Sequence, residues 1–98
     1  MPLNVTMSAS CVRPGDQMTV VAETVKGAQV GFAAAYSDND FVPDIFWVRG
    51  EANPTGKATW AFVIRPTTPP GDAVLEVVAA HEGKGATYEG YFRVAASC

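Results

Sequence analysis

Several patterns that carry function in small proteins are missing from this chain of 98 residues. No run of apolar residues approaches the roughly 18 that a membrane-spanning helix needs. The net charge is −3, so the chain lacks the basic excess by which proteins hold nucleic acids or anionic membranes. The single histidine and the two cysteines form no Cys-x-x-Cys or Cys/His cluster, which argues against zinc. We therefore expect no nucleic-acid partner and no membrane insertion.

Helical periodicity is missing too, and a regular alternation of apolar and polar residues takes its place. Trp60, Phe62 and Ile64 fall on one side of an extended segment, as do Leu75 and Val77 in a later one. Parallel strands would need crossover helices, for which the sequence has no pattern. We predict an all-β fold, an antiparallel β-sandwich of about seven strands, forming a single domain over residues 1–98. The expected strands cover residues 3–9, 17–25, 28–36, 45–50, 57–65, 73–81 and 87–95.

Turn residues separate these segments. The stretch "RPTTPPGD" (residues 65–72) holds three prolines and a glycine between two strongly alternating runs. Proline is tolerated at such a place because a corner has no ladder hydrogen bonds to lose. We expect this stretch to end one long strand and start the next.

Three strings in the sequence support a resemblance to a known class of domain. They are "VRPGDQMTVVAE", "GKATWAFVIRPTTPPGDAVLEVVAA" and "YEGYFRVA". With its Pro-Gly turns and its aromatic-x-Val last strand, the chain resembles the Ig-like and fibronectin type III-like β-sandwich domains that are accessory modules of bacterial secreted and surface proteins. It lacks the Cys…Trp…Cys spacing of antibody domains. The resemblance implies an Ig-like scaffold or binding module and no particular ligand.

The two cysteines follow the first and the last expected strand. If the strands run alternately up and down, Cys11 and Cys98 lie at the same end, and the first and last strands of Ig-like folds are often neighbours. We expect a Cys11–Cys98 disulfide, and with it an extracellular or cell-surface location; two free cysteines are the alternative. The start, "MPLNVTMSAS", lacks the basic and apolar regions of a signal peptide. We interpret the chain as a domain of a longer secreted protein, with an intact cytosolic protein as the alternative.

Three aromatic residues are candidates for ligand binding. Phe46 and Trp47 are adjacent in an expected strand, so they point to opposite faces, and one of them must leave the core. Tyr91 points outward on the last strand. Exposed aromatic rings near carboxylates can stack a sugar ring, which suggests a carbohydrate-binding face. The alternative is that the outer ring packs under a loop or against another domain.

Acidic residues collect in the loops at one expected end of the sandwich. Oxygen ligands from neighbouring loops are what calcium binds, so Asp38, Asp40, Asp44 and Asp72 are candidate ligands. The run "SDND" lacks the pattern of an EF-hand, and Asp and Asn favour turns on their own account. Ordinary turn chemistry is therefore the competing interpretation, and we expect no other cofactor.

Catalytic patterns are weak throughout the sequence. His81 ends an expected strand, and no serine stands in the context of a catalytic nucleophile. Glu76, Glu82 and Glu89 alternate between strand faces and loops, as solvated charges do. We expect no enzyme, but a spacer or an adhesion and protein-interaction domain, with a carbohydrate-binding module as the alternative. Its partners would be neighbouring domains of a longer chain or another protein, and the module itself a monomer or a weak dimer.

Overall fold

The alternating segments form strands in a computed structural model of the chain, which describes residues 1–38, 41–42 and 48–98. The described residues contain no helix, so the prediction of an all-β fold is confirmed. All seven expected segments contain a strand, and the structure adds two strands of two residues each, β2 and β5. The strands are β1 (Asn4–Met7), β2 (Cys11–Val12), β3 (Gln17–Glu23), β4 (Gln29–Ala35), β5 (Phe41–Val42), β6 (Val48–Glu51), β7 (Lys57–Val63), β8 (Gly71–His81) and β9 (Lys84–Val94).

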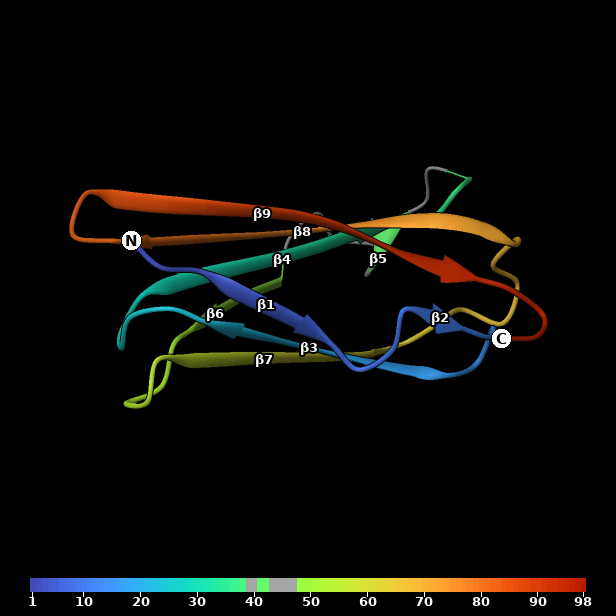
Figure 1. Cartoon of the computed structure of the whole chain (residues 1–98), viewed down its shortest axis with the longest axis horizontal. Coiled ribbons are helices and arrows are strands. Elements are labelled where there is room, and N and C mark those ends of the chain that lie inside the picture. Colours follow the sequence, from blue (N-terminus) through green and yellow to red (C-terminus); the bar gives the residue numbers. More distant parts are fainter. Residues whose placement is uncertain (39–40, 43–47) are drawn as a thin grey trace.

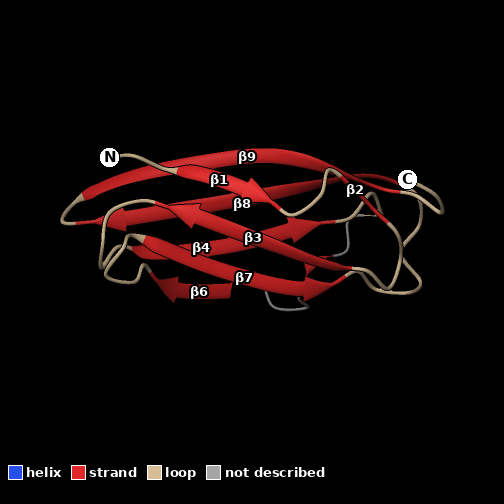
Figure 2. Ribbon diagram, turned by 60° about the horizontal axis from the view of Figure 1, so that its bottom comes forward, coloured by secondary structure: helices blue, strands red, loops and turns tan. Residues whose placement is uncertain are grey.

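The strands are divided between two sheets that lie face to face (Figure 1). The smaller sheet has the order β1-β3-β7, with antiparallel pairing throughout. The larger sheet has six strands in the order β2-β9-β8-β4-β5, and β6 also pairs with β4. Seen from a second direction, the same two layers run along the long axis of the molecule (Figure 2). A two-sheet β-sandwich is therefore the observed architecture.

The N-terminal segment takes part in both sheets. β1 pairs with β3 in the small sheet, whereas β2 pairs with β9 in the large sheet. The β2–β9 pair is parallel, a detail that the expectation of an antiparallel sandwich did not include. Backbone bonds hold it in place, from Arg93 N–H to Ser10 O (2.8 Å) and from Ala95 N–H to Val12 O (3.0 Å).

The predicted disulfide is formed at this crossing point. Cys11 and Cys98 are bridged across a sequence separation of 87, with their Cα atoms 5.8 Å apart. Cys11 belongs to β2, which pairs with the end of β9. The bridge therefore links the C-terminal residue to the point where the N-terminal segment passes from the small sheet to the large one. Nearly the whole chain is enclosed in the resulting loop.

The core lies between the sheets and is made by the inward half of each alternating segment. Met18, Val20 and Leu75 are fully buried, as the two-residue period predicts. Four aromatic rings contact one another between the sheets, Phe32 and Phe92 from the large sheet and Trp60 and Phe62 from β7 of the small sheet. The distances between ring centroids are 5.7 Å for Phe32–Trp60, 4.3 Å for Trp60–Phe62 and 6.4 Å for Phe62–Phe92. The core residues under one-tenth exposed include Val12, Ala22, Val30, Ala34, Tyr36, Ala58, Ile64, Ala73, Val77, Ala79 and Val94.

The proline-rich corner between β7 and β8 is fixed by the loop that follows β4. Arg65 lies over the Tyr36 ring, 5.2 Å from its centroid, and its guanidinium is 3.3 Å from the Asp38 carboxylate. The Tyr36 hydroxyl also accepts a hydrogen bond from the Arg65 backbone N–H. These contacts bring two loops together at one end of the sandwich, as the up-and-down order of strands predicts.

Candidate binding face

The outer face of the six-stranded sheet is formed by the outward half of three adjacent strands, although Gly31 and Ala33 on it are themselves buried. We define it by Gly31, Ala33 and Ala35 on β4, Val74, Glu76 and Val78 on β8, and Thr87, Glu89 and Tyr91 on β9. The strand register places these residues in rows that cross the sheet. The rows are Gly31–Val78–Thr87, Ala33–Glu76–Glu89 and Ala35–Val74–Tyr91.

Small side chains on β4 leave this face hollowed. Because Gly31, Ala33 and Ala35 project little or nothing, the taller side chains on the flanking strands rise above them. One hollow of about 400 Å³ includes Gly31, Val78 and Arg49 of β6. A second hollow of about 610 Å³ lies over the other half of the face and is lined by Ala35, Tyr36, Ser37, Asp72, Val74, Glu76, Glu89 and Tyr91.

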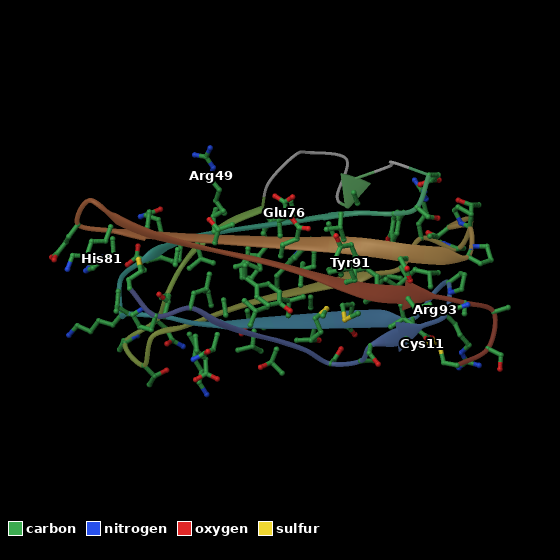
Figure 3. The ribbon with its side chains drawn as sticks, turned by 45° about the horizontal axis from the view of Figure 1, so that its top comes forward. Cys11, Arg49, Glu76, His81, Tyr91 and Arg93 are labelled. Carbon is green, nitrogen blue, oxygen red and sulfur yellow. A yellow bond between two sulfur atoms is a disulfide. The ribbon has the colours of Figure 1, made fainter. Side chains whose placement is uncertain are left out.

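Apolar side chains are exposed on the same face. Tyr91 is 63% exposed and Val78 is 36% exposed, and both lie on this one face. Figure 3 shows Glu76, Tyr91 and Arg93 along this side of the molecule, with Arg49 standing above it. The face therefore offers both apolar contact and charge to a partner.

Tyr91 and Glu89 form a polar pair on β9. The Tyr91 hydroxyl donates a hydrogen bond to Glu89 Oε1 at 3.0 Å, although both side chains stand in solvent. This bond raises the pKa of the Tyr91 phenol above its ordinary value of 10.0, and the negative charge of Glu89 adds to the effect. The hydrogen bond thus orients the phenol along its strand.

Two carboxylates lie directly opposite each other beside this pair. Glu76 on β8 is the cross-strand neighbour of Glu89 on β9, and like charges in that arrangement repel. Within the part of the chain that the structure describes, no Lys, Arg or His side chain forms an ion pair with either of them. The sequence did not point to this pairing, because the register of β8 against β9 is needed to find it.

The predicted aromatic residues are only partly placed. Tyr91 lies on the outer face as expected, whereas Phe46 and Trp47 fall outside the described residues. The expected grouping of the three therefore stays a prediction. What the structure brings next to Tyr91 is a set of acidic residues, Asp72, Glu76 and Glu89, in the second hollow.

The candidate calcium ligands are likewise only partly placed. Asp38 is paired with Arg65, and Asp72 lines the second hollow on the outer face, while Asp40 and Asp44 fall outside the described residues. Among residues 1–38, 41–42 and 48–98, no three His, Cys, Asp or Glu side chains gather in a way that could hold a metal ion. Asp16 has a turn role, since its carboxylate accepts a hydrogen bond from the Arg13 N–H at 2.9 Å.

His81, Ser8 and Ser37 make local contacts at strand ends and turns. His81 is at the end of β8, 3.7 Å from the carboxylate of Glu82 in the next turn. Ser8 accepts a hydrogen bond from the Thr19 backbone N–H, and Ser37 donates one to the Pro70 carbonyl. These two hydroxyls are thus used in local structure.

Comparison with known proteins yields a likeness of fold. No family model and no curated protein sequence matches the chain. Among solved structures, it is similar to the sporulation control protein Spo0M from Bacillus subtilis, with a TM-score of 0.52 and 10% sequence identity. The match covers 94% of this chain and 48% of the other, so the chain spans about half the length of that protein. At this level of identity the likeness concerns the fold alone. In the described segments no helix is long and apolar enough to cross a membrane.

Proposed function

We propose that the chain is a non-catalytic, Ig-like module of an extracellular protein, acting in adhesion and protein interaction. The observation that carries this proposal is the outer face of the large sheet, which leaves Val78 and Tyr91 exposed beside hollows over β4. Exposed apolar area with a polar surround is typical of surfaces that bind other proteins. The acidic residues Glu76 and Glu89 would select among partners by charge.

The strand order supports the Ig-like assignment. Among the seven strands expected from the sequence, the first, second and fifth form the small sheet, and the seventh, sixth and third are neighbours in the large one. The third, sixth and seventh strands also share a sheet in immunoglobulin domains. The fourth strand here, β6, pairs with β4 in the large sheet, whereas it joins the other sheet in constant-type domains.

The disulfide supports the extracellular location, because such bridges persist in oxidising compartments and are rare in the cytosol. A spacer role is compatible with the same module. The first and last residues lie at opposite ends of the long axis, which measures 41 Å (Figures 1 and 2). A module joined to others at both ends would separate them by most of that length.

The interaction proposal is tested by site-specific photocrosslinking in the cells that make the protein. A photoreactive residue at Val78 reports on the outer face, and one at Val63, which is 59% exposed on β7 of the small sheet, is the matched control. We expect a protein crosslinked from position 78 and not from position 63. Equal crosslinking from both positions, or none from position 78, would contradict an interaction through this face.

Carbohydrate binding is the second candidate, favoured by one feature of the same face. Tyr91 offers an exposed ring, and the carboxylates of Asp72, Glu76 and Glu89 beside it could accept hydrogen bonds from sugar hydroxyls. A glycan array compares the native protein with Tyr91→Ala and Trp47→Ala. Specific binding that either substitution abolishes would favour this candidate, and silence across the array would oppose it.

A further inference from the structure

We propose that the open edge of β9 accepts an extended segment of a partner protein as an added strand, and that this segment carries Lys or Arg at alternate positions. The inference rests on the proposed interaction role and specifies how the partner is held. Two independent features of the described chain lead to it. One is the set of backbone groups along β9, and the other is the charge next to them.

The backbone of β9 is paired on one side and largely open on the other. On one side β8 covers β9 from Lys84 to Val94 without interruption. On the other side, among the described residues, only β2 pairs with it, at Arg93 and Val94. The edge before Arg93 therefore has no strand beside it, which is the situation in which sheets recruit a further strand.

The direction of the open groups follows from one hydrogen bond. The Arg93 N–H points away from β8, because it donates to Ser10 O on the β2 side at 2.8 Å. In an antiparallel ladder every second residue directs its N–H and C=O to the same side, and the register with β8 is uniform along β9. Gly85, Thr87, Glu89 and Tyr91 thus direct their backbone donors and acceptors to the open edge. All four residues are exposed.

The charge beside this edge selects the partner. Glu89 lies on the edge strand itself, and Glu76 lies directly behind it on β8, with no ion-pair partner for either within the described residues. A strand added to β9 would place every second side chain on the outer face, next to Thr87, Glu89 and Tyr91. A Lys or Arg at the position facing Glu89 would relieve the repulsion between the two carboxylates, and a neighbouring one could contact the Tyr91 ring.

Two cationic residues of the protein itself, Lys84 and Arg93, lie at the two ends of the open part of β9. Lys84 is at its start beside the β8–β9 turn, and Arg93 is at its end, where β2 already pairs. Arg93 shares the outer face with Glu89, whereas Lys84 falls on the other face of β9 by alternation, so the added strand is expected to hold its cations beside Glu89 and away from Arg93. Backbone pairing would supply affinity for any extended segment, and the spacing of the cations would supply specificity.

A designed peptide tests this inference without knowledge of the natural partner. The probe is a nine-residue peptide with blocked ends in which Lys and Thr alternate. Controls are a peptide of the same composition with the Lys residues in one block, a Glu-for-Lys version, and a version methylated on every backbone nitrogen. Fluorescence anisotropy gives affinities at low and physiological salt, and amide hydrogen exchange measured by NMR locates the contact.

We expect the alternating peptide to bind at least about tenfold more tightly than each control. It should slow exchange of the Thr87, Glu89 and Tyr91 amides at least tenfold, because these N–H groups become paired. Glu89→Gln and Glu76→Gln should each weaken binding several-fold. Glu51→Gln, on β6 near the opposite edge of the same sheet, is the matched control and should leave binding unchanged.

Thr87→Pro tests the edge from the protein side. Its N–H faces the open edge, so proline should keep the β8 ladder while removing a donor and blocking the added strand. We expect at least a tenfold loss of affinity with an unchanged thermal melt. If this variant fails to fold, the methylated peptide tests the same claim on the native protein.

Strand addition is overturned if the block or methylated peptide binds as well as the alternating one, if the edge amides gain no protection, or if no peptide binds. These outcomes are separable from a failure of the interaction role itself. Crosslinking from position 78 alongside a negative peptide result would keep the interaction role and reject the strand-addition mode.

Discussion

Single residues determine the local geometry wherever the chain turns sharply. Gly56 is the last residue of the loop between β6 and β7, has a φ of +81°, and donates its N–H to Asn53 O at 2.8 Å. The carbonyl of Thr24 lies where a β-carbon at position 56 would stand. Both the backbone angle and the close approach therefore require glycine.

Gly56→Ala is expected to lower the free energy of unfolding by about 2–3 kcal/mol, because it combines left-handed strain with a steric clash against backbone. Urea denaturation followed by tryptophan fluorescence measures the change. Gly50→Ala is the control, since an added β-carbon there meets nothing within 4 Å. Equal effects of the two substitutions would contradict this explanation.

Tyr91 allows a second test at the residue scale. Glu89→Gln removes the charge that accepts the phenol proton, so the pKa of Tyr91 should fall toward its ordinary value. In the native protein the raised pKa favours folding below pH of about 10, and this contribution is lost as the pH rises through the raised value. Ultraviolet titration near 295 nm, with Tyr91→Phe to identify the signal among three tyrosines, measures the pKa. An unchanged pKa in Glu89→Gln would refute the pairing as its cause.

At the scale of the element, β8 is the central strand of the large sheet and contributes the buried apolar side chains of Ala73, Leu75, Val77 and Ala79. Leu75 is fully buried, and its neighbours across the sheet on the same face are Ala34 and Gly90. Ala34 and Gly90 are too small to fill the space that Leu75 would leave, and the Tyr88 ring is the large side chain that lies over Gly90. Removing most of the Leu75 side chain is therefore expected to leave a cavity in the core.

Leu75→Ala should therefore destabilise the fold by about 3–5 kcal/mol, the upper part of the range for buried leucines. Val63→Ala on β7, where the side chain is 59% exposed, is the matched control and should change stability by less than about 0.5 kcal/mol. Denaturation curves of both variants give the comparison. A loss below about 1 kcal/mol for Leu75→Ala would mean that the core relaxes around the cavity.

Most of the elements were predictable from sequence because strands such as β3, β7 and β8 carry a two-residue period, whereas β4 is buried at five successive positions. Trp60, Ile64, Leu75 and Val77, which this period placed together on one side of their segments, are all buried. β2 was not predicted, because two residues are too short to show alternation. The Glu76–Glu89 pairing could not be predicted because it depends on the register of β8 against β9, which the sequence pattern does not give. Tyr91 could be assigned to the outside, but its acidic neighbours follow from pairing.

At the scale of the whole molecule, the Cys11–Cys98 bridge is the dominant constraint on the unfolded chain. The sequence separation of 87 makes the closed loop almost as long as the protein. Closing a loop of that length corresponds to about 4–5 kcal/mol in the chain-entropy treatment. This is large beside the total stability of about 5–15 kcal/mol that is usual for a domain.

Replacing both cysteines by serine should lower the free energy of unfolding by about 3–5 kcal/mol, mainly through the unfolded state. Native protein treated with reductant should show the same loss, which separates the bridge from the effect of the serines themselves. Denaturation with and without reductant makes the comparison. A double variant as stable as the oxidised protein would show that the loop contributes nothing.

The position of the bridge also decides how the molecule would respond to a pull on its two ends. A force applied at Met1 and Cys98 would pass along the first eleven residues and then directly through the sulfur–sulfur bond. The covalent path of the force would bypass the strands from β3 to β9, which would be loaded only through the pairing of β1 with β3 and of β2 with β9. Shearing β1 away from β3 would lengthen the tether only slightly, because the first eleven residues already reach from one end of the molecule to the other and their fully extended span is about 35 Å. The sandwich would stay folded under loads that unravel an unbridged domain from end to end.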